Sequence, residues 1–131
     1  MRAVVPRHDV THSIDRKLED IARHPFRAKF RLRGRDRAIA ALRGPATIRR
    51  HAHDLIAQRL APAEPRNDGK QTPYHGHPVF VAQHATATCC RTCLERWHRI
   101  PKGRDLTSEE RDYVTDVICR WIEREMAGAP R

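Results

Sequence analysis

The sequence contains no apolar run that could cross a membrane, since a transmembrane helix needs about 18 or more consecutive apolar residues. It also lacks an apolar stretch near its N-terminus, so we expect no secretory signal and a cytoplasmic location. Aromatic residues make up only 5% of the 131 residues. A chain of this length and composition has room for one domain with a modest core.

Several catalytic sequence motifs are absent as well. There is no Gly-x-Ser-x-Gly motif, no P-loop and no dinucleotide-binding fingerprint, so the sequence does not predict a serine hydrolase, a P-loop nucleotidase or a nicotinamide-dependent enzyme. Four cysteines in a chain without a secretory signal favour thiol chemistry or metal binding over a disulfide framework.

Lysine is scarce, whereas arginine is abundant. Of the 26 basic residues only four are lysines, and the formal net charge is +10. Residues 1–60 hold fifteen basic and six acidic residues, whereas residues 61–131 hold eleven and ten. A GC-rich genome would also favour arginine over lysine, but it would not concentrate the positive charge in one half. The asymmetry therefore predicts an anionic partner, with nucleic acid the leading candidate.

The apolar spacing predicts a mainly α-helical, small single-domain fold. We expect the domain to span residues 26–127, after a tail and short helix in residues 1–25 and before a short tail in residues 128–131. Residues 1–12 are expected to be a disordered tail. Helices are predicted from Ser13 to Pro25, from Asp36 to Arg43, from Thr47 to Leu60, over residues 79–99 with a break near Thr86–Thr88, and from the capping box at Thr107–Glu110 onward.

Two segments without helical periodicity are predicted to bind anions. Residues 26–37 alternate basic and apolar residues and are interpreted as an extended basic arm, with phosphate contacts from Arg27, Lys29, Arg31 and Arg33. Residues 61–78 contain four prolines and two glycines, and a loop of this length inside a compact domain is usually functional. We expect this loop to fold over the cysteines, and expect anion binding by Lys70, Gln71, Lys102 and Arg104.

Cysteine and histidine residues are concentrated in residues 75–98, which hold three of the four cysteines and four of the nine histidines. Thiolate and imidazole are the ligands that zinc prefers, so this segment is a candidate metal site. The candidate ligands are His77, His84, Cys89, Cys90, Cys93 and His98. Cys119 is expected to pack in the last helix instead.

The spacing Cys90-x2-Cys93-x4-His98 matches the first three ligands of a zinc knuckle, but Gly103 stands at the fourth position. A fourth ligand would then be His84, His77 or water, and three protein ligands plus water describe a catalytic zinc site. An iron–sulfur centre would need a further thiolate or a histidine. Buried cysteines that only pack, without any metal, are the remaining alternative.

With these motifs assembled, the chain resembles a bacterial family of unknown function, domain of unknown function 4186. The resemblance covers about residues 26–124. It rests on residues 47–51, 59–63, 67–73, 76–80, 82–91, 93–94, 97–98 and 100–104. Tyr74-His75 and Thr92 depart from the usual pattern, which favours His77 over His75 as a ligand. The resemblance implies no activity.

The leading functional hypothesis is a small zinc protein that binds nucleic acid and could also process it. One alternative is a thiol- or metal-dependent enzyme on a small anionic substrate, with His84, Cys90 and His98 as catalytic residues. Another is a structural zinc module that binds other proteins. A continuous basic face beside an exposed Phe26 or Phe30 would favour nucleic acid.

Overall fold

The computed structural model describes residues 7–128, and within this part of the chain it forms seven α-helices and no strand. The helices are α1 (Arg7–Ala22), α2 (Pro25–Ala28), α3 (Gly34–Arg43), α4 (Pro45–Arg59), α5 (Pro78–Ala85), α6 (Arg91–His98) and α7 (Ser108–Met126). The predicted small, mainly α-helical fold is therefore confirmed. Between residues 7 and 128, no helix is both long and apolar enough to span a membrane.

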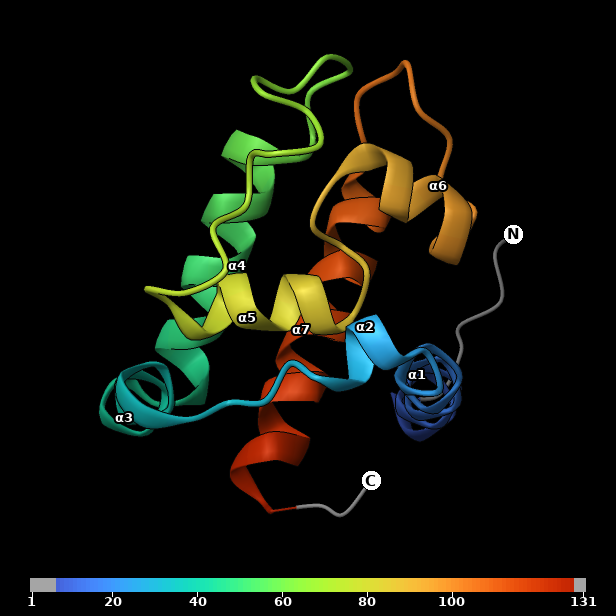
Figure 1. The fold of residues 1–131 in the computed structure, drawn as a ribbon. Helices are drawn as coiled ribbons and strands as arrows, with labels where there is room; N and C mark the ends of the chain where they lie inside the picture. Colours follow the sequence, from blue (N-terminus) through green and yellow to red (C-terminus); the bar gives the residue numbers. More distant parts are fainter. Residues whose placement is uncertain (1–6, 129–131) are drawn as a thin grey trace.

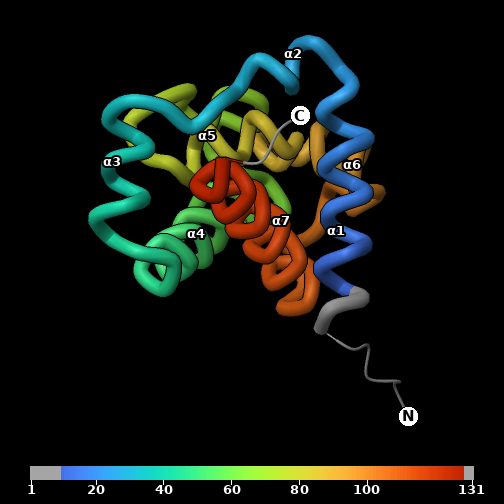
Figure 2. The backbone as a smooth tube through the Cα atoms, turned by 90° about the horizontal axis from the view of Figure 1, so that it is seen from below, coloured from blue at the N-terminus to red at the C-terminus, as the bar shows by residue number. Residues whose placement is uncertain are grey.

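Helix α7 lies at the centre of the fold. It contacts α4 on one side and α1 on the other, and α5 crosses it on a third side (Figure 1, Figure 2). Val114, Val117 and Ile118 of α7 are completely buried against Ile56 of α4 and the rest of the core. Each large apolar side chain buried in this way stabilises the fold by about 1.5–3 kcal/mol. The last helix is thus the scaffold on which the site is built.

The N-terminus of α7 carries the predicted capping box. The Thr107 hydroxyl accepts a hydrogen bond from the Glu110 backbone N–H, and the Glu110 carboxylate accepts one from the Thr107 N–H. Helix α4 begins at Pro45, two residues before the predicted Thr47. Gly44, at φ +81°, supplies the positive-φ residue before it. Proline is suited to the first helical position, because it lacks the backbone N–H that would have no partner in the helix there.

Helix α1 begins earlier than predicted. Residues 7–12 form the first turns of α1 instead of a tail, and Ser13 lies inside the helix. Residues 1–6 lie outside the described part of the chain. Ile14 and Leu18 belong to the hydrophobic core and pack α1 against α7. The first helix is therefore part of the same packed unit as the rest.

The predicted extended basic arm is wrong. Its beginning forms the short helix α2, and its end forms the start of α3. Phe30 and Leu32 are buried in the core rather than placed beside an exposed surface. The alternation of basic and apolar residues instead reflects packing, since Phe30 and Leu32 attach the segment to the hydrophobic core.

The predicted break near Thr86–Thr88 is confirmed, because α5 ends at Ala85 and α6 starts at Arg91. Buried polar groups close this turn internally. Thr86 Oγ1 donates to the Ala82 carbonyl, and Gln83 Nε2 donates to the Thr88 carbonyl. The turn is therefore rigid, and it carries Cys89 and Cys90 at its end.

Two long loops are fastened together by Arg91, which is only 1% exposed. Its guanidinium donates to five backbone carbonyls, and these partners compensate the loss of water around the charge. The acceptors are the carbonyls of Leu60, Ala61 and Pro62 in one loop and of Pro101 and Arg104 in the other.

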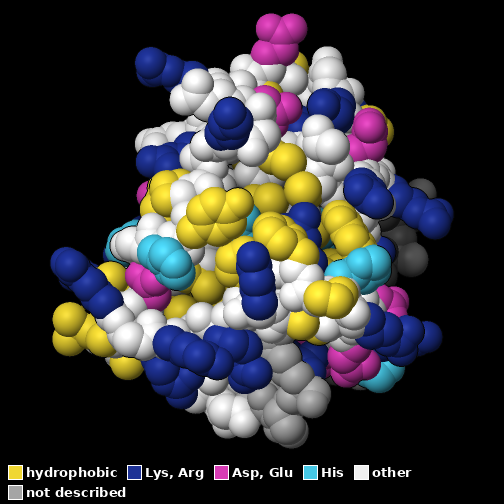
Figure 3. All heavy atoms as spheres, in the orientation of Figure 1, with side chains coloured by type: hydrophobic (Ala, Val, Ile, Leu, Met, Phe, Trp, Pro, Cys, Tyr) yellow, Lys and Arg dark blue, Asp and Glu magenta, His cyan; other side chains and the backbone are white. Residues whose placement is uncertain are grey.

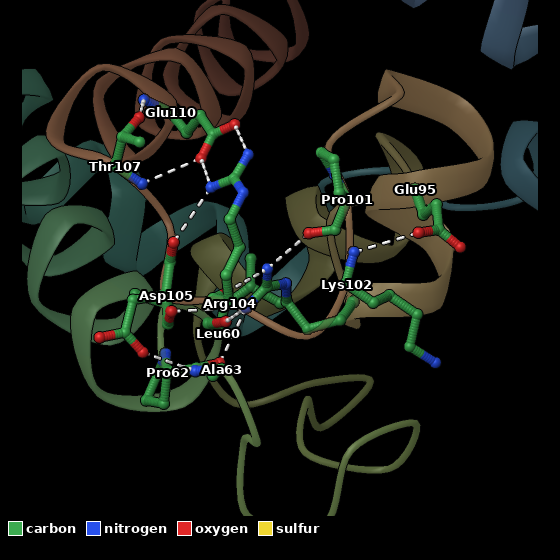
Figure 4. A network of polar contacts seen from close by, with 12 residues as sticks. Leu60, Pro62, Ala63, Glu95, Pro101, Lys102, Arg104, Asp105, Thr107 and Glu110 are labelled. Carbon is green, nitrogen blue, oxygen red and sulfur yellow. Dashed lines mark hydrogen bonds and ion pairs between the residues drawn. The ribbon is translucent and has the colours of Figure 1, made fainter.

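Further hydrogen bonds around Arg91 hold the second loop in place (Figure 4). The Asp105 carboxylate accepts from the Ala63 N–H, which joins the two loops directly. The Lys102 N–H donates to the Glu95 carboxylate of α6. The loop after α6 is therefore tied both to the loop after α4 and to α6 itself.

Candidate metal centre

Three cysteines meet at the start of α6. Cys89 and Cys90 end the turn after α5, and Cys93 lies in the first helical turn. Cys90 is the N-cap of α6, and its Sγ accepts a hydrogen bond from the Cys93 N–H at 3.4 Å. The three Sγ atoms lie within 4.8 Å of one another, with Cys89 Sγ and Cys93 Sγ 3.7 Å apart. They are placed to bind a metal ion.

The sulfur spacing fits a small tetrahedral ion. Zinc–sulfur bonds are about 2.3 Å long, which makes the edge of a tetrahedral thiolate site about 3.8 Å. The distance between the sulfurs of Cys89 and Cys93 is close to this edge before any ion is added. Within residues 7–128, these cysteines are the one group of three or more potential ligands that converges in this way.

Arg27 of α2 provides a buried positive charge beside the cysteines. Its side chain is only 7% exposed, and it donates to Cys93 Sγ at 3.1 Å, Cys89 Sγ at 3.6 Å and the His84 carbonyl at 2.8 Å. A buried guanidinium requires a negative partner, because desolvation of an unpaired charge is costly. Here Cys93 and Cys89 place their sulfur atoms where a thiolate would supply that charge.

The cysteines share their protons unequally. Hydrogen bonds from Cys89 and Cys90, followed by the guanidinium of Arg27, hold the pKa of the Cys93 thiol well below its usual range. The pKa of Cys89 is raised by its hydrogen bonds with Cys90 and then with Cys93, to whose sulfur its thiol donates, and by burial. Cys93 is half-buried, so its thiolate is the reactive sulfur of the group.

The loop over residues 61–77 packs against the cysteines. Thr72 Oγ1 donates to the Cys89 carbonyl at 2.8 Å, and the Thr72 carbonyl lies 3.0 Å from His84 Nε2. Asp68 accepts from the Arg91 N–H, next to Cys90, and from the side-chain amide of Gln71. The loop therefore forms one wall of the cysteine site.

None of the three predicted histidine ligands joins the cysteines. His84 Nε2 bonds the Thr72 carbonyl, and burial lowers its pKa. His98 bonds the Tyr113 hydroxyl through Nδ1 and the Thr86 carbonyl through Nε2, both at 2.8 Å. His77 is the N-cap of α5, where its Nδ1 accepts from the Val79 N–H. The structure thus brings together the three predicted cysteine ligands and separates them from the predicted histidine ligands.

The four predicted anion-binding residues do not converge. The Arg104 guanidinium forms a two-pronged ion pair with Glu110, which lowers the pKa of that carboxyl to about 2 (Figure 4). Lys102 Nζ donates to the Thr92 hydroxyl, Gln71 is buried within its own loop, and Lys70 is exposed. The charged groups of Lys102 and Arg104 thus bind different partners rather than one shared site.

The predicted nucleic-acid contacts divide into two pairs. Arg27 is buried on the thiolates, and Arg31 pairs with Glu125 at 3.1 Å, a carboxylate that is itself buried. The Arg27 guanidinium is therefore not available to a phosphate, whereas the half-buried Arg31 guanidinium pairs with Glu125 through Nε. Lys29 and Arg33 are exposed. Arg27 is buried and Arg31 is half-buried, because Phe30 and Leu32 on the same segment pack in the core.

Sequence reasoning missed two pairings at this end of the molecule. Arg27 and Cys89 are 62 residues apart, so no local spacing connects them. His51 Nδ1 of α4 lies 3.0 Å from Nε2 of His77, the N-cap of α5. The apolar neighbours Phe26 and Phe30 indicate that the segment of Arg27 packs against the domain. This pattern alone does not predict whether the Arg27 side chain is buried or exposed.

The fold and site define a small all-helical domain with a buried arginine beside a three-cysteine cluster. Residues 15–123 match the family described as a domain of unknown function, DUF4186, and the chain belongs to this family. No solved structure shows a significant match to the chain.

Proposed function

We propose that this protein is a zinc protein and that Cys89, Cys90 and Cys93 bind the ion as thiolates. The observation that carries the proposal is the convergence of the three sulfur atoms within 4.8 Å at a rigid turn-to-helix junction. Thiolates select zinc and other thiophilic ions over magnesium or calcium. An iron–sulfur cluster would need a fourth thiolate or a histidine, but His84 Nε2 and both ring nitrogens of His98 are bonded elsewhere.

The charge of the surroundings supports three thiolates. Three thiolates and one zinc ion leave one negative charge, and the buried guanidinium of Arg27 neutralises it. Such a balanced group can lie in a protein interior, where an unbalanced one would be costly. The same guanidinium lowers the pKa of Cys93, which favours metal binding at neutral pH because the metal ligand is the thiolate.

The fourth coordination position is proposed to hold water. Both ring nitrogens of His77 and His98 and the Nε2 of His84 are engaged in other hydrogen bonds, and Cys93 is on the half-buried side of the cluster. A zinc ion with three protein ligands and one water is the composition found in catalytic sites, where the ion activates the water.

Metal content of the purified protein tests the zinc proposal. We expect about one zinc ion per chain, and we expect Cys93→Ser to lose it, whereas Cys119→Ser should retain it because Cys119 packs against the core on α7. A chelator should lower the melting temperature of the wild type and of Cys119→Ser alike. Metal-free wild-type protein that melts at the same temperature with and without added zinc would contradict the proposal.

Nucleic-acid binding is a second candidate function. It is favoured by the net charge of +10 and by exposed basic side chains on one face, at Lys29, Arg33 and Arg35. Neutralised phosphates release counterions, so affinity for a DNA or RNA oligonucleotide should fall steeply as salt rises. Absence of binding to either nucleic acid at low salt would contradict this candidate function and leave the zinc proposal untouched.

A further inference from the structure

Exposed aromatic rings lie next to exposed cations on the face above the cysteines. Tyr74 is 54% exposed and Phe26 is 46% exposed, although large aromatic side chains usually lie inside. Figure 3 shows hydrophobic side chains gathered over the middle of this face, with Lys and Arg side chains among them and around them. Isolated exposed hydrophobic residues are ordinary, but here the exposed rings of Phe26 and Tyr74 both contact the buried ring of Phe30.

The rings form a connected stack. Tyr74 lies nearly parallel to His84, with ring centroids 4.3 Å apart, and nearly parallel to Phe30 at 6.0 Å. Phe26 meets the edge of Phe30 at 5.3 Å. Because His84 and Phe30 are buried beneath them, Tyr74 and Phe26 are fixed in orientation before any ligand arrives. Rigid rings are suited to stacking on flat ligands at a low entropic cost.

Cations are placed around these rings. Lys29 Nζ lies 4.5 Å from the centre of the Phe26 ring and 5.4 Å from that of Phe30. Next to Tyr74, an open hollow of about 570 Å³ is lined by Arg33, Arg35, Asp36, His75 and Gly76. This volume is within the range of about 300–1,000 Å³ typical of ligand sites.

The positive groups of the hollow are available to an anion. Arg33 and Arg35 are exposed, and no partner among residues 7–128 engages either guanidinium. The one carboxylate of the hollow, that of Asp36, is buried, accepts from the Gly76 N–H at 3.1 Å and lies 3.7 Å from His75 Nδ1. Asp36 therefore shapes the rim, while the two arginines face solvent.

We propose that this surface binds single-stranded nucleic acid, with a base stacked on Tyr74 or Phe26 and the neighbouring phosphates held by Lys29, Arg33 and Arg35. The inference rests on the second candidate function above and specifies its substrate class. Ring faces are accessible only in unpaired bases, and stacking platforms beside a basic groove are the usual means of binding single strands. A duplex would contact the cations and leave the rings unused.

Fluorescence anisotropy with a labelled strand of about 12 nucleotides tests this surface, since single-strand sites commonly span about 4–16 nucleotides. The probes are the strand as DNA, the same sequence as RNA, and the DNA duplex. We expect tighter binding of the single strands, and a loss of about tenfold or more for Tyr74→Ala or Phe26→Ala, the size expected when one stack is removed. Tyr74→Trp should retain the affinity.

Substitution of the cations should act differently. Arg33→Gln together with Arg35→Gln should weaken single strand and duplex alike. The slope of log affinity against log salt should decrease, for each phosphate no longer neutralised, by about 0.7 for the single strand and about 0.9 for the duplex. Arg66→Gln with Arg96→Gln, an equal decrease in charge at exposed positions elsewhere, is the matched control. Melting temperatures of all variants exclude unfolding as the cause.

The outcomes separate this inference from the proposal on which it rests. If no probe binds at low salt, nucleic-acid binding itself is wrong. If single strand and duplex bind equally and Tyr74→Ala and Phe26→Ala change neither, nucleic-acid binding stands and the stacking surface is overturned. Weaker single-strand binding on removal of either ring, with duplex affinity unchanged, supports the assignment.

Discussion

The guanidinium of Arg27 contacts two sulfur atoms and one backbone carbonyl, and no carboxylate is among these contacts. It therefore depends on thiolate for charge balance, and the thiolates depend on it. This mutual dependence makes Arg27 part of the proposed metal site although it is not a candidate ligand. Its effect can be measured in the chelator-treated protein, where no ion contributes to the pKa of the cysteines.

We expect Arg27→Met to raise the pKa of Cys93 by about 1–3 units, the usual effect of removing a cation at hydrogen-bonding distance. The rate of alkylation by iodoacetamide, measured against pH, reports this pKa because only the thiolate reacts. The wild-type rate should persist at lower pH than that of the variant. Arg31→Met removes a guanidinium that pairs with Glu125 instead, and it should leave the profile unchanged. Superimposable profiles for wild type and Arg27→Met would contradict the role assigned to Arg27.

Among the helices, α6 is joined to two neighbours by His98. Its Nε2–H donates to the Thr86 carbonyl of the turn, so its Nδ1 accepts from the Tyr113 hydroxyl of α7. Burial lowers the pKa of His98 to about 4 and raises the pKa of Tyr113 to about 12. The neutral imidazole is therefore the form that holds the turn, α6 and α7 together.

This pairing predicts a pH-dependent stability. The folded pKa of His98 lies below its ordinary value of 6.5, so the unfolded chain takes up the proton first as pH falls. Its stabilising contribution is fully present above pH 6.5 and is lost between pH 6.5 and about 4, at up to about 1.4 kcal/mol per pH unit.

Urea unfolding of metal-free protein across this range should show the decrease in stability, and His98→Gln should reduce its slope. His12→Gln, at an exposed position on α1, controls for removal of an imidazole. Burial also lowers the pKa of His77 and His84, so some slope should remain in the variant. An unchanged slope in His98→Gln would show that His98 is not the group responsible.

The elements that the sequence predicts well are those with local signals. The capping box at Thr107–Glu110 places the start of α7, and the weak helical pattern at Thr86–Thr88 predicts the break that carries Cys89. The start of α1 is missed because a single apolar residue, Val10, continues the helical spacing of Ile14 and Leu18 among polar neighbours, although Val10 packs against the core. Local propensity says little about residues whose structure is stabilised by a distant helix.

The same distinction applies to the candidate site. The three cysteines are predictable because they lie close in sequence, and thiolates at such spacing bind metals. Arg27 cannot be paired with them from the sequence, because Arg27 and Cys89 are 62 positions apart and no local spacing indicates their contact. The histidines are expected as ligands by residue type, but their hydrogen bonds to Thr72, Thr86 and Val79 depend on the fold.

Across the whole domain, internal ion pairs use part of the charge asymmetry of the sequence. Arg31 and Arg49 from the basic half pair with Glu125 and Asp116 of α7, and Arg120 of α7 pairs with Asp15 of α1. The two halves thus lie against each other rather than acting separately. The positive charge left on the surface includes Lys29, Arg33 and Arg35, beside the exposed rings.

X-ray absorption at the zinc edge of the purified protein would show whether three thiolates of this helical domain bind one zinc ion. We expect three sulfur atoms at about 2.3 Å and one oxygen or nitrogen atom at about 2.0 Å. The Cys119→Ser variant should give the same spectrum. A shell without sulfur, or one with a single sulfur atom, would rule out Cys89, Cys90 and Cys93 as the ligands.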